Sequence, residues 1–148
     1  EKKSKQNNLG KKDKDRLTPE LVMKFINNEE IESNKPVVTE LQGKMKTAFY
    51  KPVVIIDYER SAFTYPVNDV RITLDYNISC SYEFSKFFDK NINSIPLLEK
   101  NTAILEVKYN DFLPDFIKNL INMKNLEITS FSKYSTGRDM LEKIERRI

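Results

Sequence analysis

Residues 58–75, YERSAFTYPVNDVRITLD, place Arg60, Arg71 and Asp75 between runs of aliphatic and aromatic residues. Guanidinium groups pair with phosphate oxygens in a bidentate geometry, so two arginines on one surface suit an extended anion. The alternative is ordinary, because a charged strand face is often just the face that water covers. The chemistry therefore depends on whether the two arginines share one face of a sheet, and on whether that face is enclosed.

A turn at residues 66–69 would pair the two halves of this segment as an antiparallel hairpin, with Arg60 opposite Asp75 and Thr64 opposite Arg71. Opposed residues share a face, and Arg60 and Arg71 then lie about 13 Å apart along the sheet. Tyr58 belongs to the same face. The other face is apolar and sets the register, since a slip of one residue would bury the arginines. Its members are Phe63, Tyr65, Val70, Ile72 and Leu74.

The composition excludes several classes of enzyme. The 148 residues include no histidine and one cysteine, so histidine-based triads, histidine-ligated zinc and an internal disulfide are excluded. Cys80 is expected to be a small buried residue. The net charge is only +3, yet residues 1–16 hold seven basic residues against three acidic ones. Nucleic-acid binding is not expected, because the basic residues do not accompany an exposed aromatic platform.

The residue patterns predict an α+β fold made of strands with flanking helices. Helices are predicted over residues 17–31, 36–49 and 111–124, with a short one after Gly137. Strands are predicted over residues 53–60, 69–75, 103–109 and 126–134, and residues 1–16 carry a weaker hairpin signal. Thr18 is the expected N-cap of the first helix, with Pro19 at its first position. An open sheet gives several strands one charged face each, and a closed one would turn those faces into a basic tunnel.

Four motifs, in order, resemble the VTC domain, the polyphosphate polymerase branch of the triphosphate tunnel metalloenzyme (CYTH-like) superfamily. They are YERSAFTYP, VRITLD, LEVKY and FSKY, and the segments EKK and KDKDRL at the start also fit. The resemblance implies an antiparallel β tunnel with flanking helices. It also implies that residues 1–148 are the C-terminal portion of a single tunnel domain whose first strands are absent before Glu1. Ser130 stands where the family pattern has a lysine.

The resemblance assigns roles to ten residues. Arg60, Arg71 and Lys108 would be the catalytic residues that hold the reacting phosphates, and Glu106 would hold a divalent metal, Mn²⁺ or Mg²⁺. Phosphate contacts would also come from Lys3, Lys14, Arg16, Tyr58, Ser132 and Lys133. The implied reaction transfers the γ-phosphate of ATP onto a growing polyphosphate chain. The acceptor is itself an anionic oxygen, so positioning and charge neutralisation are enough and no strong base is needed.

Two alternatives share these residues. A non-catalytic module that binds polyphosphate or inositol phosphates needs the basic residues but not the metal. A hydrolase of the same fold would cleave triphosphates, and only its products would distinguish it. The resemblance further implies ATP and polyphosphate or pyrophosphate as partners. It also suggests a cytoplasmic location, with a membrane-protein partner that would bring the chain to the inner face of a membrane.

Overall fold

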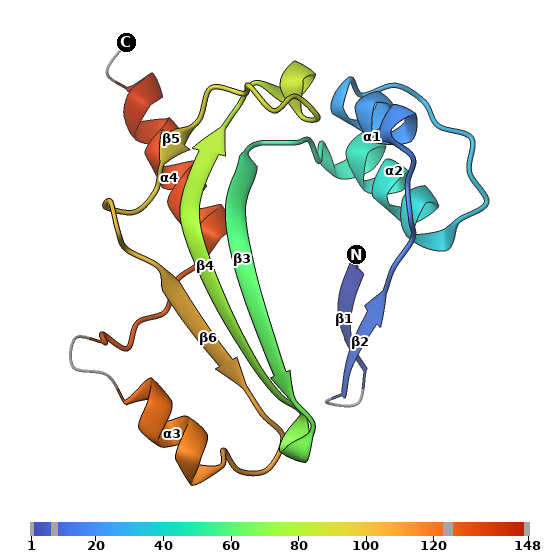
Figure 1. The fold of residues 1–148 in the computed structure, drawn as a ribbon. Coiled ribbons are helices and arrows are strands. Elements are labelled where there is room, and N and C mark those ends of the chain that lie inside the picture. The colour runs from blue at the N-terminus through green and yellow to red at the C-terminus, as the bar shows by residue number, and fades with distance from the viewer. Residues whose placement is uncertain (1, 7–8, 123–125, 147–148) are drawn as a thin grey trace. The chain divides into compact units, whose positions relative to one another are not determined.

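The computed structural model describes residues 2–6, 9–122 and 126–146, which fold as two compact units. The first unit comprises Glu1–Val53 and Glu83–Ile92, and the second comprises Val54–Tyr82 and Asn93–Ile148. Helices and antiparallel strands occur in both units, which confirms the α+β prediction (Figure 1). No helix among the described residues has both the length and the apolarity that crossing a membrane requires.

The first unit begins with an antiparallel hairpin of β1 (Lys2–Gln6) and β2 (Leu9–Asp13), in which Lys3 lies opposite Lys12. This confirms the hairpin predicted from a weak signal. Two helices follow, α1 (Pro19–Ile26) and α2 (Pro36–Ala48). The Thr18 side chain accepts a hydrogen bond from the Leu21 backbone N–H, so the predicted N-cap is confirmed.

Buried Phe25, Ile31 and Val38 form the core of the first unit. The N-terminus of α2 has no cap from its own flanking residue; instead the Val37 N–H donates to Asp15 Oδ2 at 3.0 Å. Asp15 thereby satisfies a backbone donor that has no partner inside the helix. This bond fixes the segment between β2 and α1, which also carries Lys14 and Arg16.

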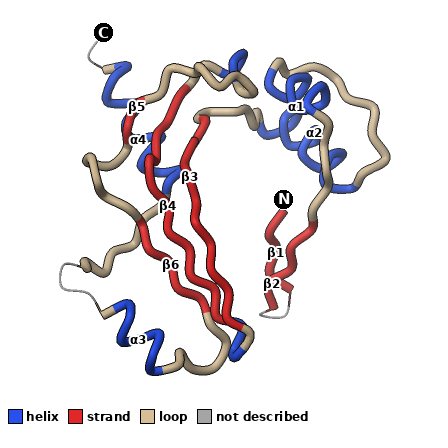
Figure 2. The backbone as a smooth tube through the Cα atoms, in the orientation of Figure 1, coloured by secondary structure: helices blue, strands red, loops and turns tan. Residues whose placement is uncertain are grey.

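The second unit is built on a sheet of four strands: β3 (Ile55–Tyr65), β4 (Val70–Ser81), β5 (Ile95–Pro96) and β6 (Ile104–Lys108). β4 is the central strand, with β3 along one edge and β5 and β6 along the other (Figure 2). Arg60 pairs with Asp75 and Thr64 with Arg71, so the predicted hairpin register is confirmed. The turn contains the short 3₁₀ helix η1 (Val67–Asp69), where Asn68 and Asp69 adopt positive φ.

A β-bulge at Asn77 changes the register of β4 against β3. Asp57 pairs with Ser79 while Glu59 pairs with Tyr76, so two residues of β4 oppose the single residue Tyr58. Asn77 has a φ of 52°, and its side-chain amide donates to Glu59 Oε1. Because one residue is added, Ile78 and Cys80 point to the same face of the sheet as Arg71 and Asp75.

Two helices pack against this sheet, α3 (Asp115–Ile121) and α4 (Lys133–Glu145). α4 contacts β3 and β4 on the face that carries Ile56 and Cys80, where a Cβ on Gly137 would lie 2.6 Å from Ile56 Cδ1. The absence of a side chain at Gly137 allows this close approach. On the opposite face, the Phe116 ring of α3 meets the Tyr65 ring edge-on, with the centroids 5.3 Å apart. The helix predicted over residues 111–124 is therefore confirmed in a shorter form, and its Phe116 contacts the sheet.

The strand predicted over 126–134 and the predicted start of the last helix need correction. The strand predicted over 126–134 is wrong, because residues 126–132 form no strand and Lys133 opens α4, with Gly137 inside the helix rather than before it. Ser132 caps that helix by accepting from the Ser135 N–H, and this local bond outweighs the alternating pattern that suggested a strand. The sheet is also open, since among the described strands β3 and β6 each pair with β4 alone. A closed tunnel therefore stays a prediction.

Candidate functional site

The face of the sheet on which α4 packs carries five of the ten predicted site residues, and we call it the α4 face. Strand alternation and the observed register arrange its charged part in three rows across β3, β4 and β6. These rows are Arg60–Asp75–Ile104, Ala62–Thr73–Glu106 and Thr64–Arg71–Lys108. At the other end of the same face lie Val54, Ile56, Ile78 and Cys80, which pack under α4. One continuous face thus changes from apolar core to charged surface.

The first row contains a buried ion-pair network. Asp75 is 2% exposed, and its two oxygens accept from Arg60 Nε at 2.5 Å and from Arg60 Nη2 at 2.7 Å. Lys133 Nζ, from the first residue of α4, lies 2.5 Å from Asp75 Oδ2. The Tyr58 ring faces both cations, with its centroid 5.2 Å from Arg60 Cζ and 4.9 Å from Lys133 Nζ. Side chains from β3, β4 and α4 therefore meet at one point: Tyr58, Arg60, Asp75 and Lys133.

The electrostatics of this network favour the charged forms. The Arg60 guanidinium, and after it Lys133, lowers the pKa of Asp75 to about 2, although burial alone would raise it. Hydrogen bonding to Asp75 raises the pKa of Arg60 in turn. Asp75 is therefore ionised throughout the physiological range and holds two cations in place.

The other two rows are more open. Glu106 and Lys108 form an ion pair along β6, with Lys108 Nζ 3.0 Å from Glu106 Oε1 and both side chains about half exposed. Arg71, directly opposite Lys108 on β4, is exposed and forms no ion pair with any residue that the structure describes. Its guanidinium donors are thus available to an added anion.

Thr73 adds a second unsatisfied group to this face. It is 2% exposed, lies between Ala62 and Glu106 in the middle row, and its Oγ1 has no hydrogen-bond partner among the described atoms. Buried polar side chains nearly always find a partner, and exceptions often mark a place where a water molecule, an ion or a ligand binds. Thr73 was not among the residues singled out from the sequence, because a threonine in a strand is unremarkable there.

The remaining predicted contacts fall in two places. Ser132 is exposed at the N-terminus of α4, where its Oγ accepts from the Ser135 hydroxyl and N–H. Lys14 and Arg16 lie in the first unit, exposed, just after β2, and the Arg16 carbonyl accepts from Lys35. Lys3 belongs to β1, and its side chain lies outside the described part of the structure. The convergence of these three first-unit residues with Arg60 and Arg71 stays a prediction.

The residues near Glu106 meet the needs of a divalent metal only in part. Among the described residues, no three of the His, Cys, Asp and Glu side chains gather closely enough to form a metal site. Mg²⁺ is, however, commonly held by one or two protein carboxylates together with phosphate oxygens. Glu106 fits that arrangement, provided that the metal displaces the Lys108 ammonium from its carboxylate.

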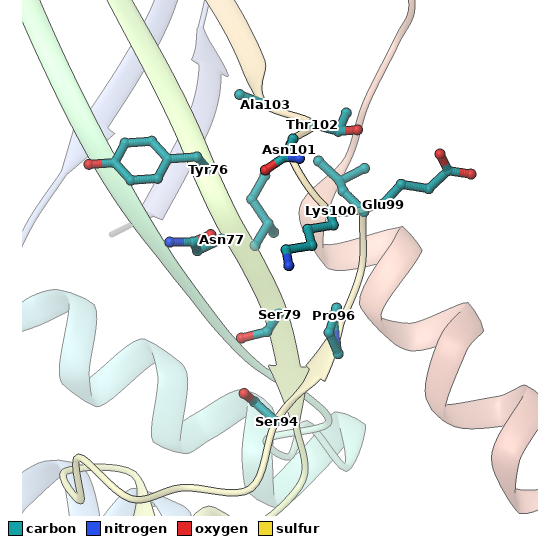
Figure 3. Close-up of a pocket in the computed structure, with 12 residues that line it drawn as sticks. Tyr76, Asn77, Ser79, Ser94, Pro96, Glu99, Lys100, Asn101, Thr102 and Ala103 are labelled. Atoms are coloured by element: carbon teal, nitrogen blue, oxygen red, sulfur yellow. The ribbon is translucent and has the colours of Figure 1, made fainter.

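A cavity of about 690 Å³ lies elsewhere in the second unit, between the bulged part of β4 and residues 94–103 (Figure 3). None of the ten predicted site residues lines it. Its charged lining residues are Glu99 and Lys100, of opposite sign, and the rest of its polar lining is hydroxyl and amide groups. A polyanion gains little from such a balanced lining, so the α4 face is the better candidate site.

Comparison with known families assigns the chain to one of them. The family model described as the VTC domain matches residues 1–142. The chain belongs to the VTC domain family. A curated relative, vacuolar transporter chaperone complex subunit 4 of Schizosaccharomyces pombe, is 31% identical over 134 residues, which cover 73% of this chain and 18% of the relative. No solved structure matches.

The VTC domain chain therefore spans about a fifth of the length of the curated relative it matches. What its charged face offers chemically can be read from the described contacts alone. Arg60 and Lys133 are fixed by the shared carboxylate of Asp75, and Arg71 has no ion-pair partner among the described residues. Glu106 is the one carboxylate in the rows Ala62–Thr73–Glu106 and Thr64–Arg71–Lys108. The charge and spacing of this set suit an extended anion lying along β4.

Proposed function

We propose that this VTC domain forms part of a polyphosphate polymerase, which transfers the γ-phosphate of ATP onto a growing polyphosphate chain. The observation that carries the proposal is the shared face: Arg60, Arg71 and Lys108 lie on one side of one sheet, with Glu106 between them. The family membership and the motifs YERSAFTYP and VRITLD support it.

In this proposal the phosphate chain runs along β4. Arg60 and Lys133 bind at one end, and Arg71 and Lys108 bind about 13 Å further along. The buried Thr73 hydroxyl, halfway between, donates to a phosphate oxygen. These residues orient the donor and acceptor oxygens and neutralise their charge, which is most of what phosphoryl transfer asks of a protein.

A divalent metal, Mn²⁺ or Mg²⁺, would be held by Glu106 and phosphate oxygens, and it would supply further neutralisation of the transferred group. Lys108 would then leave Glu106 and turn its ammonium to the phosphates. Further strands would pair with the open edges of β3 and β6 to enclose the face, and Lys3, Lys14 and Arg16 would contribute from the first unit.

One observation favours a second candidate, a non-catalytic polyphosphate-binding module. Glu106 already pairs with Lys108, and no group of three metal-ligating side chains forms among the described residues. A binding module would need the basic residues without any metal. The name of the fission yeast relative describes a subunit of a complex, so we propose that this chain also binds a protein partner.

The test is to incubate the full-length protein with ATP and Mn²⁺ and to analyse the products. Long phosphate polymer is expected, and Glu106→Ala should abolish it while leaving binding of added polyphosphate largely intact. Glu127→Ala, an exposed glutamate in the segment before α4, is the matched control and should remain active. Tight polyphosphate binding without polymer would favour the module, and release of inorganic phosphate from triphosphate would indicate a hydrolase.

A further inference from the structure

Two cations of the proposed site share one buried anion, Asp75, to which the resemblance assigns no role. Arg60 lies on β3 and Lys133 opens α4, yet both contact the same carboxylate of Asp75 on β4. Asp75 is 2% exposed, whereas the Arg60 and Lys133 side chains are 33% and 23% exposed. The carboxylate is thus covered, and the cations above it remain accessible.

The geometry leaves both cations able to bind a second anion. A guanidinium has five N–H donors in a fixed plane, and Asp75 takes two of them, one from Nε and one from Nη2. Three donors of Arg60 therefore remain. The Lys133 ammonium gives one of its three donors to Asp75 and keeps two.

Asp75 also limits the freedom of these side chains. A bidentate contact fixes the plane of the Arg60 guanidinium, which an isolated arginine on a strand would not keep. The Tyr58 ring lies against both cations and restricts them further. Without the carboxylate, two positive groups from separate elements would repel each other, and the first turn of α4 would lose its charged contact with the sheet.

We propose that Asp75 is a positioning residue of the phosphate site, which holds Arg60 and Lys133 together so that both contact one end of a bound phosphate chain. The inference rests on the proposed function for the identity of the ligand. The opposite role for Asp75 predicts a change of polyphosphate affinity in the opposite direction. If Asp75 only neutralised the two cations, it would compete with phosphate, and its removal would strengthen binding.

The experiment measures binding of long-chain polyphosphate to the full-length protein by titration, at several NaCl concentrations. Asp75→Asn keeps the shape of the side chain and removes its charge. Asp75→Glu keeps the charge and moves the carboxylate by one methylene. Asp115→Asn, an exposed aspartate of α3 that pairs with Lys118, is the matched control. Circular dichroism identifies the variants that remain folded.

Positioning predicts that both Asp75 variants bind polyphosphate about tenfold more weakly or worse, since charge-assisted contacts to Arg60 and Lys133 are lost or misplaced. The salt dependence of binding should also flatten, because fewer cations engage the polyanion. A purely structural role would lower stability but leave this slope unchanged in the folded protein. The control should bind as the wild type does.

Unchanged or tighter binding by Asp75→Asn would overturn the inference, and if that variant does not fold, wild-type affinity in Asp75→Glu would do so. The proposed function fails separately. A wild type that binds polyphosphate but forms no polymer refutes the polymerase and leaves Asp75 to be decided by its variants. A wild type that does not bind polyphosphate refutes both.

Discussion

The ion-pair network at Asp75 predicts a stability that depends on pH in a defined window. Arg60 and Lys133 lower the pKa of this carboxyl from 3.8 to about 2 in the folded protein. A carboxyl whose pKa is depressed on folding stabilises the native state above its unfolded pKa, and loses that contribution as the pH falls through the folded value. The relevant window therefore runs from about pH 5 down to about pH 1.

The magnitude follows from the shift. A difference of nearly two pKa units corresponds to about 2 kcal/mol at pH 7, roughly half of that at pH 3, and only a small remainder at pH 2. Asp75→Asn removes this contribution. The free energy of unfolding of the wild type should therefore exceed that of the variant by about 2 kcal/mol at pH 7, and the gap should nearly close by pH 2.

Urea unfolding followed by far-UV circular dichroism, at pH 7, 3 and 2, measures the gap. Asp115→Asn, whose side chain is exposed and pairs only along its own helix, should show no such change with pH. A gap between wild type and Asp75→Asn that stays the same from pH 7 to pH 2 would refute the reasoning. It would mean that the carboxylate acts through its shape and not through its charge.

Five other outcomes are expected. Arg71→Ala should leave thermal stability unchanged, because Arg71 has no ion-pair partner among the described residues, yet it should weaken polyphosphate binding about tenfold in a titration. Gly137→Val should cost about 1–3 kcal/mol in urea unfolding, because its side chain would meet Ile56; Gly43→Ala, which has open space, should gain about 0.5–1 kcal/mol. Ser132→Ala should lose about 1 kcal/mol, since it removes the cap of α4. Cys80, 1% exposed and with its thiol pKa raised by burial, should react with a thiol reagent only after the sheet and α4 separate, and equal labelling rates in native and unfolded protein would contradict this.

The sequence was sufficient to predict the hairpin and to predict which face of the sheet carries the arginines. Strict alternation in VRITLD, with a turn at residues 66–69, determined which side chains share a side, and the register confirms it. The sequence was misleading at residues 126–134, where alternating Ser, Phe and Lys resembles a strand. There the Ser132 side chain accepts a hydrogen bond from a backbone N–H and starts a helix. An alternating pattern does not reveal that such a local bond competes with strand formation.

The part of the site that could not be foreseen depends on contacts between distant elements. Asp75 was visible opposite Arg60, but its second partner, Lys133, lies 58 positions later on a helix that was expected to be a strand. The bulge at Asn77 gave no clear signal either, because an asparagine in a strand is compatible with several local conformations. Burial of Thr73 without a partner follows only from three-dimensional packing.

The extra residue at Asn77 changes which side chains of β4 lie on the α4 face. Before Asn77 the odd-numbered side chains, including Asp75, lie on the α4 face. After Asn77 the even-numbered ones do, so that Ile78 and Cys80 join the apolar core. Deleting that single residue would not simply shorten the strand. It would rotate one half by a full pleat, exchanging Ile78 and Cys80 for serines beneath the helix or turning Asp75 away from Lys133. Length variation at this position should therefore be tolerated far less than substitution, even though the position itself is exposed.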